Sequence, residues 1–322
     1  MDGPAGTMIL LEHVTKLYGT VIGVNDLTAS LPQGAYGLVG PNGSGKSTLL
    51  NLLTGQLRPT LGRIAVLGQP PWNNARLCQR LGVCPEQDAF YPNITPLEWV
   101  RYLLELQGFS GSEASERAEA ALEQVGLAET RRRPLGECSR GMRQRAKLAQ
   151  ALAHDPSLLI LDEPFAAVDP LGRRRMVELI RRRIAEGKGV VIASHLLHEV
   201  EAVTDRFLLI CGGRLLASGT AEEVYALLEE LPKEVRLRAD QPRRLARQLL
   251  ETELADAVRL TGRDELVVST DSPGRLYRQL PQLVDRAGVR VFELRAAEGS
   301  LQALFDALLR IHRGMKILQP RD

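Results

Sequence analysis

Glycine, serine and lysine residues between Gly40 and Ser47 have a spacing that could do chemistry. This stretch reads GPNGSGKS and fits the pattern GxxxxGK[ST]. Glycines let backbone N–H groups turn inward around phosphate oxygens, lysine supplies positive charge, and a serine hydroxyl can bind Mg²⁺. An apolar run precedes the stretch and a helical pattern (48–53) follows it. The positive end of that helix would point at the same anions. The residues predicted to hold phosphate groups or the rest of a nucleotide here are Gly40, Asn42, Gly43, Ser44, Gly45, Lys46, Ser47 and Thr48.

Two adjacent carboxylates follow an apolar run later in the chain. Leu158-Leu-Ile-Leu precedes Asp162 and Glu163. With a phosphate loop upstream, Asp162 is expected to bind Mg²⁺ directly or through water, together with Ser47. Glu163 is expected to polarise an attacking water as general base. Paired carboxylates at a strand end also serve as simple helix caps, which is the alternative interpretation.

Ser139 begins a further candidate element, because serine is a good N-cap and a helical pattern runs from Arg140 to Leu152. A capped helix N-terminus offers free N–H groups and a partial positive charge to a γ-phosphate. An ordinary capped helix, with no ligand, is the alternative at this point.

The elements that position these residues alternate between short apolar runs and amphipathic helical stretches from Met8 to about Leu228. Strands are predicted over Tyr36–Val39, Ser157–Leu161 and Gly189–Ala193, and a helical pattern extends from Thr95 to Gly126. This alternation predicts an α/β domain with a largely parallel sheet. Open sheets of this kind build their sites from polar residues just past the strand ends.

Composition excludes several other classes of protein. The 322 residues suggest two domains, and the net charge of +2 lacks the basic excess of a nucleic-acid-binding protein. No span of about 20 apolar residues is present, so we expect no transmembrane helix. The four cysteines are widely scattered, which predicts neither a metal site nor a disulfide framework and fits a reducing cytosol.

The C-terminal part of the sequence predicts a second domain. The composition shifts near Glu229–Pro232, which suggests domains over residues 1–230 and 231–322. The second domain is expected to be a small α+β domain, with the ferredoxin-like type as the candidate fold. A last helix is predicted from a stripe of Leu and Phe between Leu301 and Leu309. Before that last helix, the predicted elements of the second domain are strand 234–238, helix 242–250, strands 257–260 and 265–269, helix 276–287 and strand 289–294.

The chain from Met8 to Leu228 resembles the ATP-binding cassette ATPases. The run GECSRGMRQR, from Gly136 to Arg145, resembles the signature motif of that family. Its departure from the common form LSGGQ places Arg140 at the first glycine and Met142 at the glutamine. The form SRGM-[RK]-Q-R is similar to that of drug, antibiotic and polysaccharide exporter ATPases. The resemblance implies that Ser139, Arg140, Gly141 and Met142 contact nucleotide.

The resemblance also implies roles for four residues outside the main motifs. Tyr18 resembles the aromatic residue that stacks on adenine. Gln87, in Val-Cys-Pro-Glu-Gln, resembles the glutamine that touches Mg²⁺ and the water, with the following loop against a membrane subunit. His195 resembles the switch histidine that holds the γ-phosphate, the water and the base. Asp169 resembles the aspartate of the loop that couples two nucleotide sites.

For the whole protein, the family implies a P-loop ATPase fold, with a mostly parallel sheet core, a β subdomain and a helical signature subdomain. It implies ATP and Mg²⁺ as cofactors and a head-to-tail pair of subunits that closes around two ATP molecules. A homodimer is our first hypothesis, because all the site motifs are present. A separate transmembrane permease would choose the exported substrate and would hold this chain at the cytoplasmic face of the membrane.

Rival functions are also weighed against the sequence. DNA-repair cassettes carry a long coiled coil, translation-factor cassettes occur twice per chain, and GTPases need NKxD; none of these features is found. The intact Glu163 and His195 argue against a cassette that senses ATP without hydrolysing it. An ATPase that energises membrane-protein maturation or cell-surface assembly stays open as an alternative to export.

Overall fold

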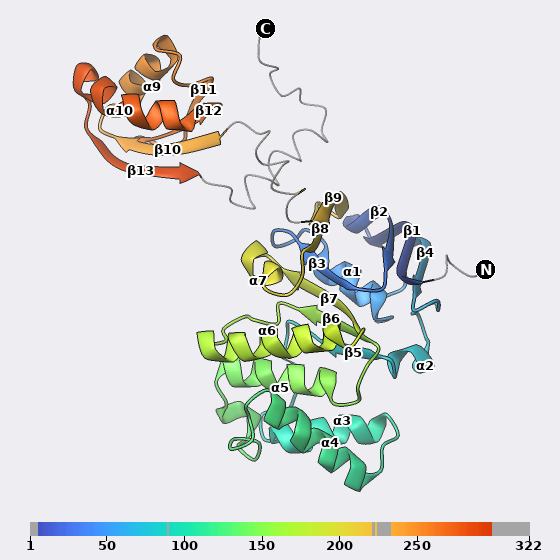
Figure 1. The fold of residues 1–322 in the computed structure, drawn as a ribbon. Helices are drawn as coiled ribbons and strands as arrows, with labels where there is room; N and C mark the ends of the chain where they lie inside the picture. Colours follow the sequence, from blue (N-terminus) through green and yellow to red (C-terminus); the bar gives the residue numbers. More distant parts are fainter. Residues whose placement is uncertain (1–5, 89, 221–222, 224–232, 298–322) are drawn as a thin grey trace. The chain divides into compact units, whose positions relative to one another are not determined.

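The computed structural model describes residues 6–88, 90–220, 223 and 233–297. The chain divides into two compact units, residues 1–221 and 222–322, which are described separately (Figure 1). The predicted helix over 301–309 and the predicted boundary at residue 230 lie outside the described residues.

A six-stranded sheet forms the centre of the first unit. Five of its strands are parallel, and β9 pairs with β8 in the antiparallel direction at one edge. The central strands consist almost entirely of buried apolar residues, as expected when helices cover both faces of a parallel sheet. In sheet order the strands are β5 (Leu81–Cys84), β6 (Leu158–Asp162), β7 (Gly189–Ser194), β3 (Ala35–Val39), β8 (Arg206–Cys211) and β9 (Arg214–Thr220).

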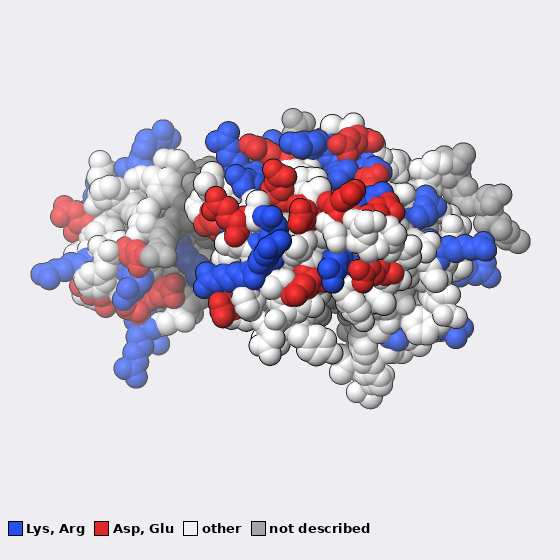
Figure 2. All heavy atoms as spheres, turned by 90° about the horizontal axis from the view of Figure 1, so that it is seen from below, with Lys and Arg blue, Asp and Glu red and all other residues white. Residues whose placement is uncertain are grey.

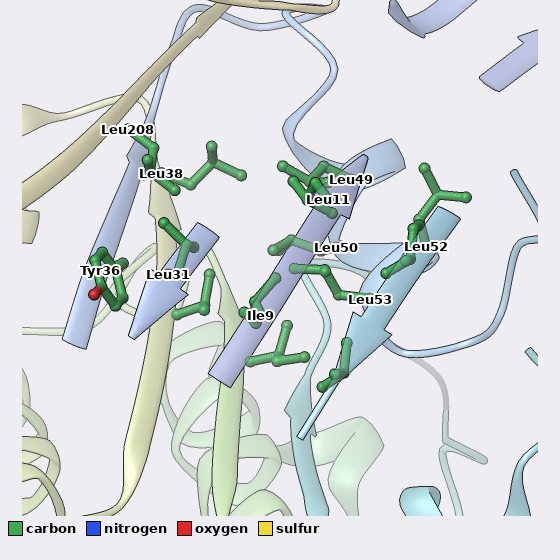
Figure 3. Close-up of a cluster of buried hydrophobic side chains, with 14 of the residues drawn as sticks. Ile9, Leu11, Leu31, Tyr36, Leu38, Leu49, Leu50, Leu52, Leu53 and Leu208 are labelled. Carbon is green, nitrogen blue, oxygen red and sulfur yellow. The ribbon is translucent and has the colours of Figure 1, made fainter. Parts of the chain in front are cut away.

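An antiparallel sheet of three strands completes the β part of this unit, with order β2-β1-β4. Its strands are β1 (Thr7–Tyr18), β2 (Val21–Pro32) and β4 (Leu61–Val66). Helix α1 (Lys46–Leu53) contributes four leucines to the core that it shares with β1 and β3 (Figure 3). This apolar packing fixes the start of α1, where the glycine-rich stretch ends.

Three helices form a group at the end of the unit farthest from β2 (Figure 1). They are α3 (Pro96–Leu106), α4 (Gly111–Gln124) and α5 (Arg140–Leu152). The continuous helical pattern predicted over 95–126 is two helices. The chain breaks because Gly108 has φ 99° and Ser110 caps α4 by accepting from the N–H of Glu113. The other helical elements of the unit are α2 (Ala75–Cys78), the 3₁₀ turn Leu135–Glu137, α6 (Pro170–Ala185) and α7 (Leu197–Glu201).

The second unit is a four-stranded antiparallel sheet with order β11-β12-β10-β13. Its β-α-β-β-α-β element order is ferredoxin-like. Leu237, Leu245 and Leu276 are fully buried in its own core. The elements are β10 (Lys233–Ala239), α9 (Pro242–Glu251), β11 (Ala257–Leu260), β12 (Glu265–Thr270), α10 (Pro273–Ala287) and β13 (Val291–Ala297).

Basic and acidic side chains alternate over the face of the protein shown in Figure 2. Many of the exposed charges are neighbours on one helix, such as Arg174 with Glu178 and Arg247 with Glu251. Within the described residues, no helix is long and apolar enough to span a membrane.

Candidate nucleotide site

Four parallel strands bring the predicted site residues to one edge of the six-stranded sheet. Because β3, β5, β6 and β7 run in the same direction, their carboxyl ends meet at that edge. The phosphate loop follows β3 and Gln87 follows β5. Asp162 ends β6, and His195 follows β7. The sheet therefore gathers residues from four distant parts of the sequence into one site.

The loop between β3 and α1 has the shape of an anion cradle. The N–H groups of Gly45, Lys46, Ser47 and Thr48 donate no hydrogen bond to any described residue, whereas Leu49 N–H donates to Gly45 O. These are the free amides that begin a helix, and they suit phosphate oxygens. Gly45 has φ 106°, and a Cβ there would lie 2.5 Å from the carbonyl oxygen of Gly23. The buried Ser44 Oγ has no partner among the described residues, so it also remains available to a ligand.

Lys46 is buried behind this loop. Its Nζ donates to Gly40 O at 2.7 Å and to Pro41 O at 3.3 Å, and it lies 4.0 Å from Glu163 Oε1. Burial lowers the pKa of Lys46, and the carboxylates of Glu163, Asp162 and Glu86 offset part of that effect. The ammonium group therefore lies between the loop carbonyls and the carboxylates, where it can neutralise phosphate charge.

Asp162 presents one unused oxygen to the site. Its Oδ1 is buried and has no hydrogen-bond partner among the described residues. Burial raises the pKa of Asp162, the Ser47 hydroxyl and Lys46 oppose that rise, and Glu86 and Glu163 add to it. A free carboxylate oxygen beside a hydroxyl is the oxygen set that Mg²⁺ prefers, since Mg²⁺ takes its other ligands from water and phosphate. The residues present therefore fit a Mg²⁺ ion held with a nucleotide.

Glu163 is held in an unusual backbone conformation. Its φ is 47°, and its N–H donates to Ala193 O of β7 at 2.9 Å. The carboxylate is buried and receives hydrogen bonds at both oxygens, from His195 at Oε1 and from Ser194 Oγ at Oε2. Non-glycine residues at positive φ persist only where their surroundings hold them, and they cluster at functional sites.

His195 binds Glu163 twice. Its backbone N–H and its Nδ1 are each 2.9 Å from Oε1 of Glu163. The His195 side chain is 46% exposed, against 8% for Glu163, so the imidazole is open on its other side. It can therefore contact a ligand while it holds the carboxylate. His198, one turn further on, is exposed and makes no side-chain hydrogen bond among the described residues.

Tyr18 ends β1 beside the start of α1. Its hydroxyl is 3.5 Å from Thr48 Oγ1, and a Cβ on Gly23 would lie 2.7 Å from the Tyr18 ring. The ring is 45% exposed, with Lys16 Nζ 5.5 Å from its centre. An exposed aromatic face next to the phosphate loop is suited to stack on a base.

Gln87 lies next to the site without a contact to it. It follows β5, the neighbour of β6, and its exposed side chain makes no hydrogen bond among the described residues. The loop that carries it is fastened to α5, because Asp88 pairs with Arg143 at 2.8 Å and with Lys147 at 3.1 Å. The position of Gln87 therefore depends on the signature helix.

The signature residues lie at the exposed start of α5. Ser139 is the N-cap predicted from the sequence, and its Oγ accepts from the N–H of Met142 at 3.2 Å. Arg140 is exposed and Met142 is partly exposed, whereas Gly141 is buried against Ala167. A Cβ on Gly141 would lie 2.7 Å from Ala167 O, so this glycine lets the helix meet the loop before α6.

Asp169 is the N-cap of α6. Its Oδ1 accepts from the N–H of Gly172 at 2.8 Å, and this backbone hydrogen bond lowers the pKa of Asp169. The loop before it contains Ala167 at φ 58°. The contact of Ala167 with Gly141 places the predicted coupling loop beside the signature helix.

Three buried residues next to the site were given no role by the sequence patterns. Gln144 of α5 is buried and donates to Glu163 O at 3.3 Å, which ties the signature helix to the carboxylates. Ser194 and Glu199 form a buried contact next to Glu163. Their partners lie far away in the sequence, and a local pattern does not reveal such pairings.

Comparisons with known proteins identify the family. A family model described as ABC transporter matches residues 24–166. An uncharacterized ABC transporter ATP-binding protein of Nostoc sp. is 37% identical over 228 residues, which are 68% of this chain and 68% of the relative. This chain belongs to the ATP-binding cassette transporter family. It is therefore an ATP-binding subunit of the transporter type and an ATPase, as its signature motif indicated.

Two further relatives of this cassette ATPase carry functional names. The Nod factor export ATP-binding protein I of Burkholderia orbicola is 38% identical over 220 residues, 68% of this chain and 71% of the relative. The linearmycin resistance ATP-binding protein of Bacillus subtilis is 34% identical over 223 residues, 69% of this chain and 72% of the relative. The resemblance to exporter ATPases is thus confirmed at the level of relatives.

Solved structures confirm the fold of this cassette ATPase. The ATP-binding subunit of an ABC transporter superposes with a TM-score of 0.63 at 26% identity, covering 69% of this chain and 93% of that one. A dimeric cassette in a post-hydrolysis state with ADP and Pi has a TM-score of 0.63 at 24% identity, covering 66% and 98%. The fold class predicted from the sequence is therefore correct.

Proposed function

We propose that this chain is the ATP-hydrolysing subunit of an exporter and that it works as a homodimer with a separate transmembrane permease. The observation that carries hydrolysis is the Glu163 carboxylate, held by His195 at the sheet edge where the phosphate loop opens. Export is supported by the SRGMRQR form of the signature and by relatives named for Nod factor export and linearmycin resistance.

Each group at the edge has a distinct part in ATP hydrolysis. The free amides at the start of α1 and the Lys46 ammonium bind the phosphates. Ser47 and Asp162 would hold Mg²⁺, which supplies charge neutralisation for the γ-phosphate, and the Gln87 amide would contact the ion and the attacking water. Glu163 accepts the proton of the attacking water, and His195 keeps its carboxylate fixed in place.

A head-to-tail homodimer would complete the site. Within one chain the amides at the start of α5 lie at the surface, where they can meet the γ-phosphate of a nucleotide on a second copy. Asp169 and Ala167 lie beside them, so that the same closure would bring this loop to the facing site. Hydrolysis removes the bridging γ-phosphate, and the two halves then separate. This alternation is the movement passed to the permease, at the cytoplasmic face of the membrane.

The C-terminal unit would stabilise the dimer, regulate it or dock a partner. Its ferredoxin-like core is built from residues of this unit alone. A chain that ends at Leu231 tests these three roles. If its ATPase rate, its assembly and its transport are unchanged, the C-terminal unit has none of them.

Two measurements on the full chain and on its Glu163→Gln variant test the proposal. The first is the rate of ATP hydrolysis, and the second is gel filtration in the presence of ATP, which detects a dimer. Glu178→Gln, at an exposed pair with Arg174, is the matched control. We expect turnover in the wild type and control, and an ATP-bound dimer without turnover in Glu163→Gln. Equal turnover in Glu163→Gln and wild type would contradict the assignment of the general base.

A role in membrane-protein maturation or cell-surface assembly is the second candidate, since the permease determines the cargo. Co-purification of the chain with its permease, followed by ATP-dependent release of a small molecule from inverted vesicles, distinguishes the two. Vesicles that hydrolyse ATP with the permease present but release no small molecule would favour the assembly role.

A further inference from the structure

A single buried hydroxyl lies between two buried carboxylates behind the proposed general base. Ser194 Oγ is 3.2 Å from Glu163 Oε2 and 2.9 Å from Glu199 Oε2. The relative exposure of these residues is 0% for Ser194, 4% for Glu199 and 7% for Glu163. A hydroxyl carries one proton, so the two carboxylate oxygens compete for it. The orientation of the hydroxyl therefore depends on both carboxylates.

Ser194 and Glu199, the two partners of this contact, are each held by a further residue. The hydroxyl accepts from the N–H of Leu196 at 3.1 Å, which closes the turn between β7 and α7. Glu199 is held from its other oxygen, because Oε1 lies 3.2 Å from the guanidinium of Arg173. A buried carboxylate needs such a partner, since an unpaired charge is costly to bury. Glu199 is thus a fixed anchor for the serine.

Ser194, held by Glu199, helps to fix the orientation of the Glu163 carboxylate. Oε1 is engaged by His195 and lies near Lys46, whereas Ser194 is the only described hydrogen-bond partner of Oε2. Without Ser194 the carboxylate would be held through Oε1 alone, so Oε2 could move away from its present position. A general base must be held within a few tenths of an ångström of its working position, so this movement would slow proton transfer.

We propose that Glu199 is a positioning residue that acts through Ser194 on the Glu163 carboxylate, with Arg173 as its anchor. The inference rests on the proposed role of Glu163 in ATP hydrolysis. Arg173 belongs to the first turn of α6, and its N–H donates to Asp169 O. The chain of contacts therefore connects the Asp169 loop with the general base of the same subunit.

A double-mutant cycle with Ser194→Ala and Glu199→Ala tests the coupling. We expect each single change to lower kcat by about 10- to 100-fold, with the KM for ATP within about threefold of wild type. The double variant should be no slower than Ser194→Ala by more than about threefold, because Glu199 acts through the serine. Two independent structural losses would instead multiply.

Arg173 supplies a second cycle with Ser194→Ala in which one of the two substitutions is partly exposed. Its side chain is 39% exposed, so Arg173→Ala removes the anchor with little loss of packing. We expect a several-fold lower kcat in the wild-type background and no further effect in the Ser194→Ala background. Arg174→Ala, next along the same helix and 80% exposed, is the matched control and should keep the wild-type kcat. Glu199→Gln retains the side-chain shape and an oxygen for Ser194, so it should be faster than Glu199→Ala.

The outcomes separate this inference from the proposed function. If wild type hydrolyses ATP and Glu163→Gln does not, but the losses from Ser194→Ala and Arg173→Ala multiply, the positioning role is wrong and the general base stands. If the Arg173→Ala chain is as active as the Arg174→Ala chain, the proposed role of Arg173 as the anchor of Glu199 is wrong as well. If Glu163→Gln hydrolyses as fast as wild type, the proposed function itself fails.

Discussion

The backbone N–H and the Nδ1 of His195 both lie 2.9 Å from one atom, Oε1 of Glu163. This double contact joins the end of β7 to the residue that follows β6. It forms because the strands are parallel neighbours, with Asp162 paired to Ala193. Glu163 is at φ 47°, so the contacts hold a residue whose backbone would otherwise relax.

Removal of the His195 imidazole should slow hydrolysis more than it weakens binding. His195→Ala keeps the backbone N–H contact but loses the Nδ1 contact at 2.9 Å. We expect kcat to fall by about 100-fold or more, with the Kd of ATP changed by less than about threefold. Single-turnover hydrolysis and equilibrium binding measure the two effects. His198→Ala, at an exposed histidine one turn on, should behave as wild type; an equal loss there would refute the prediction.

Neutralisation of Asp162 should remove the effect of Mg²⁺ on nucleotide binding. In the wild type the unpartnered Oδ1 is available to the ion. Asp162→Asn keeps the shape but lacks the charge, so Mg²⁺ should tighten ATP binding in wild type by about tenfold or more and leave the variant nearly unchanged. ATP titration with Mg²⁺ or with EDTA gives the comparison. An undiminished Mg²⁺ effect in the variant would show that Asp162 does not hold the ion.

A side chain at Gly45 should damage both the fold and the phosphate loop. Gly45→Ala combines a positive φ with a Cβ 2.5 Å from Gly23 O, whereas Gly187, at φ 79°, has open space around it. We expect Gly187→Ala to lower the free energy of unfolding by about 1 kcal/mol and Gly45→Ala by about 2–4 kcal/mol. Urea unfolding measures both. ATP affinity should fall only in Gly45→Ala; equal costs at the two positions would rule out the close approach.

The ion pairs of Asp88 with Arg143 and Lys147 should make the free energy of unfolding depend on pH at acidic pH. Burial alone would raise the pKa of Asp88, but hydrogen bonds from Arg143 and Lys147 outweigh it and lower the pKa below 3.8. The folded state therefore binds this proton less readily than the unfolded chain. The stabilisation is present above pH 3.8 and is lost as pH falls from there through the lower, folded-state pKa.

Asp88→Asn measures this contribution. At neutral pH it should lower the free energy of unfolding by about 1 kcal/mol, because the Lys147 ammonium, 1% exposed, loses a charged partner and keeps neutral acceptors, the amide oxygen and the Glu86 carbonyl. The difference from wild type should vanish as pH falls through the folded-state pKa. Asp205→Asn, at an exposed aspartate, is the control. A difference independent of pH would contradict the ion pair.

Local patterns in the sequence were sufficient for the elements that carry the motifs. The helix from Arg140 to Leu152 and its Ser139 cap agree with prediction, because capping depends on neighbouring residues. The strand predicted over 289–294 begins two residues late, at Val291, and the helical pattern over 95–126 divides at Gly108–Ser110. Apolar periodicity marks an element more sharply than it marks its ends.

The sequence by itself determined the phosphate loop, the adjacent carboxylates and the signature cap, since each is a run of contiguous residues. Only the tertiary structure decided that His195 binds Glu163, that Ser194 joins Glu163 to Glu199, and that Asp88 is fastened to α5. These contacts arise where parallel strands end side by side and where helices from other parts of the chain pack over them. Strand order and packing determine such pairings, and residue types at local spacing carry no record of either.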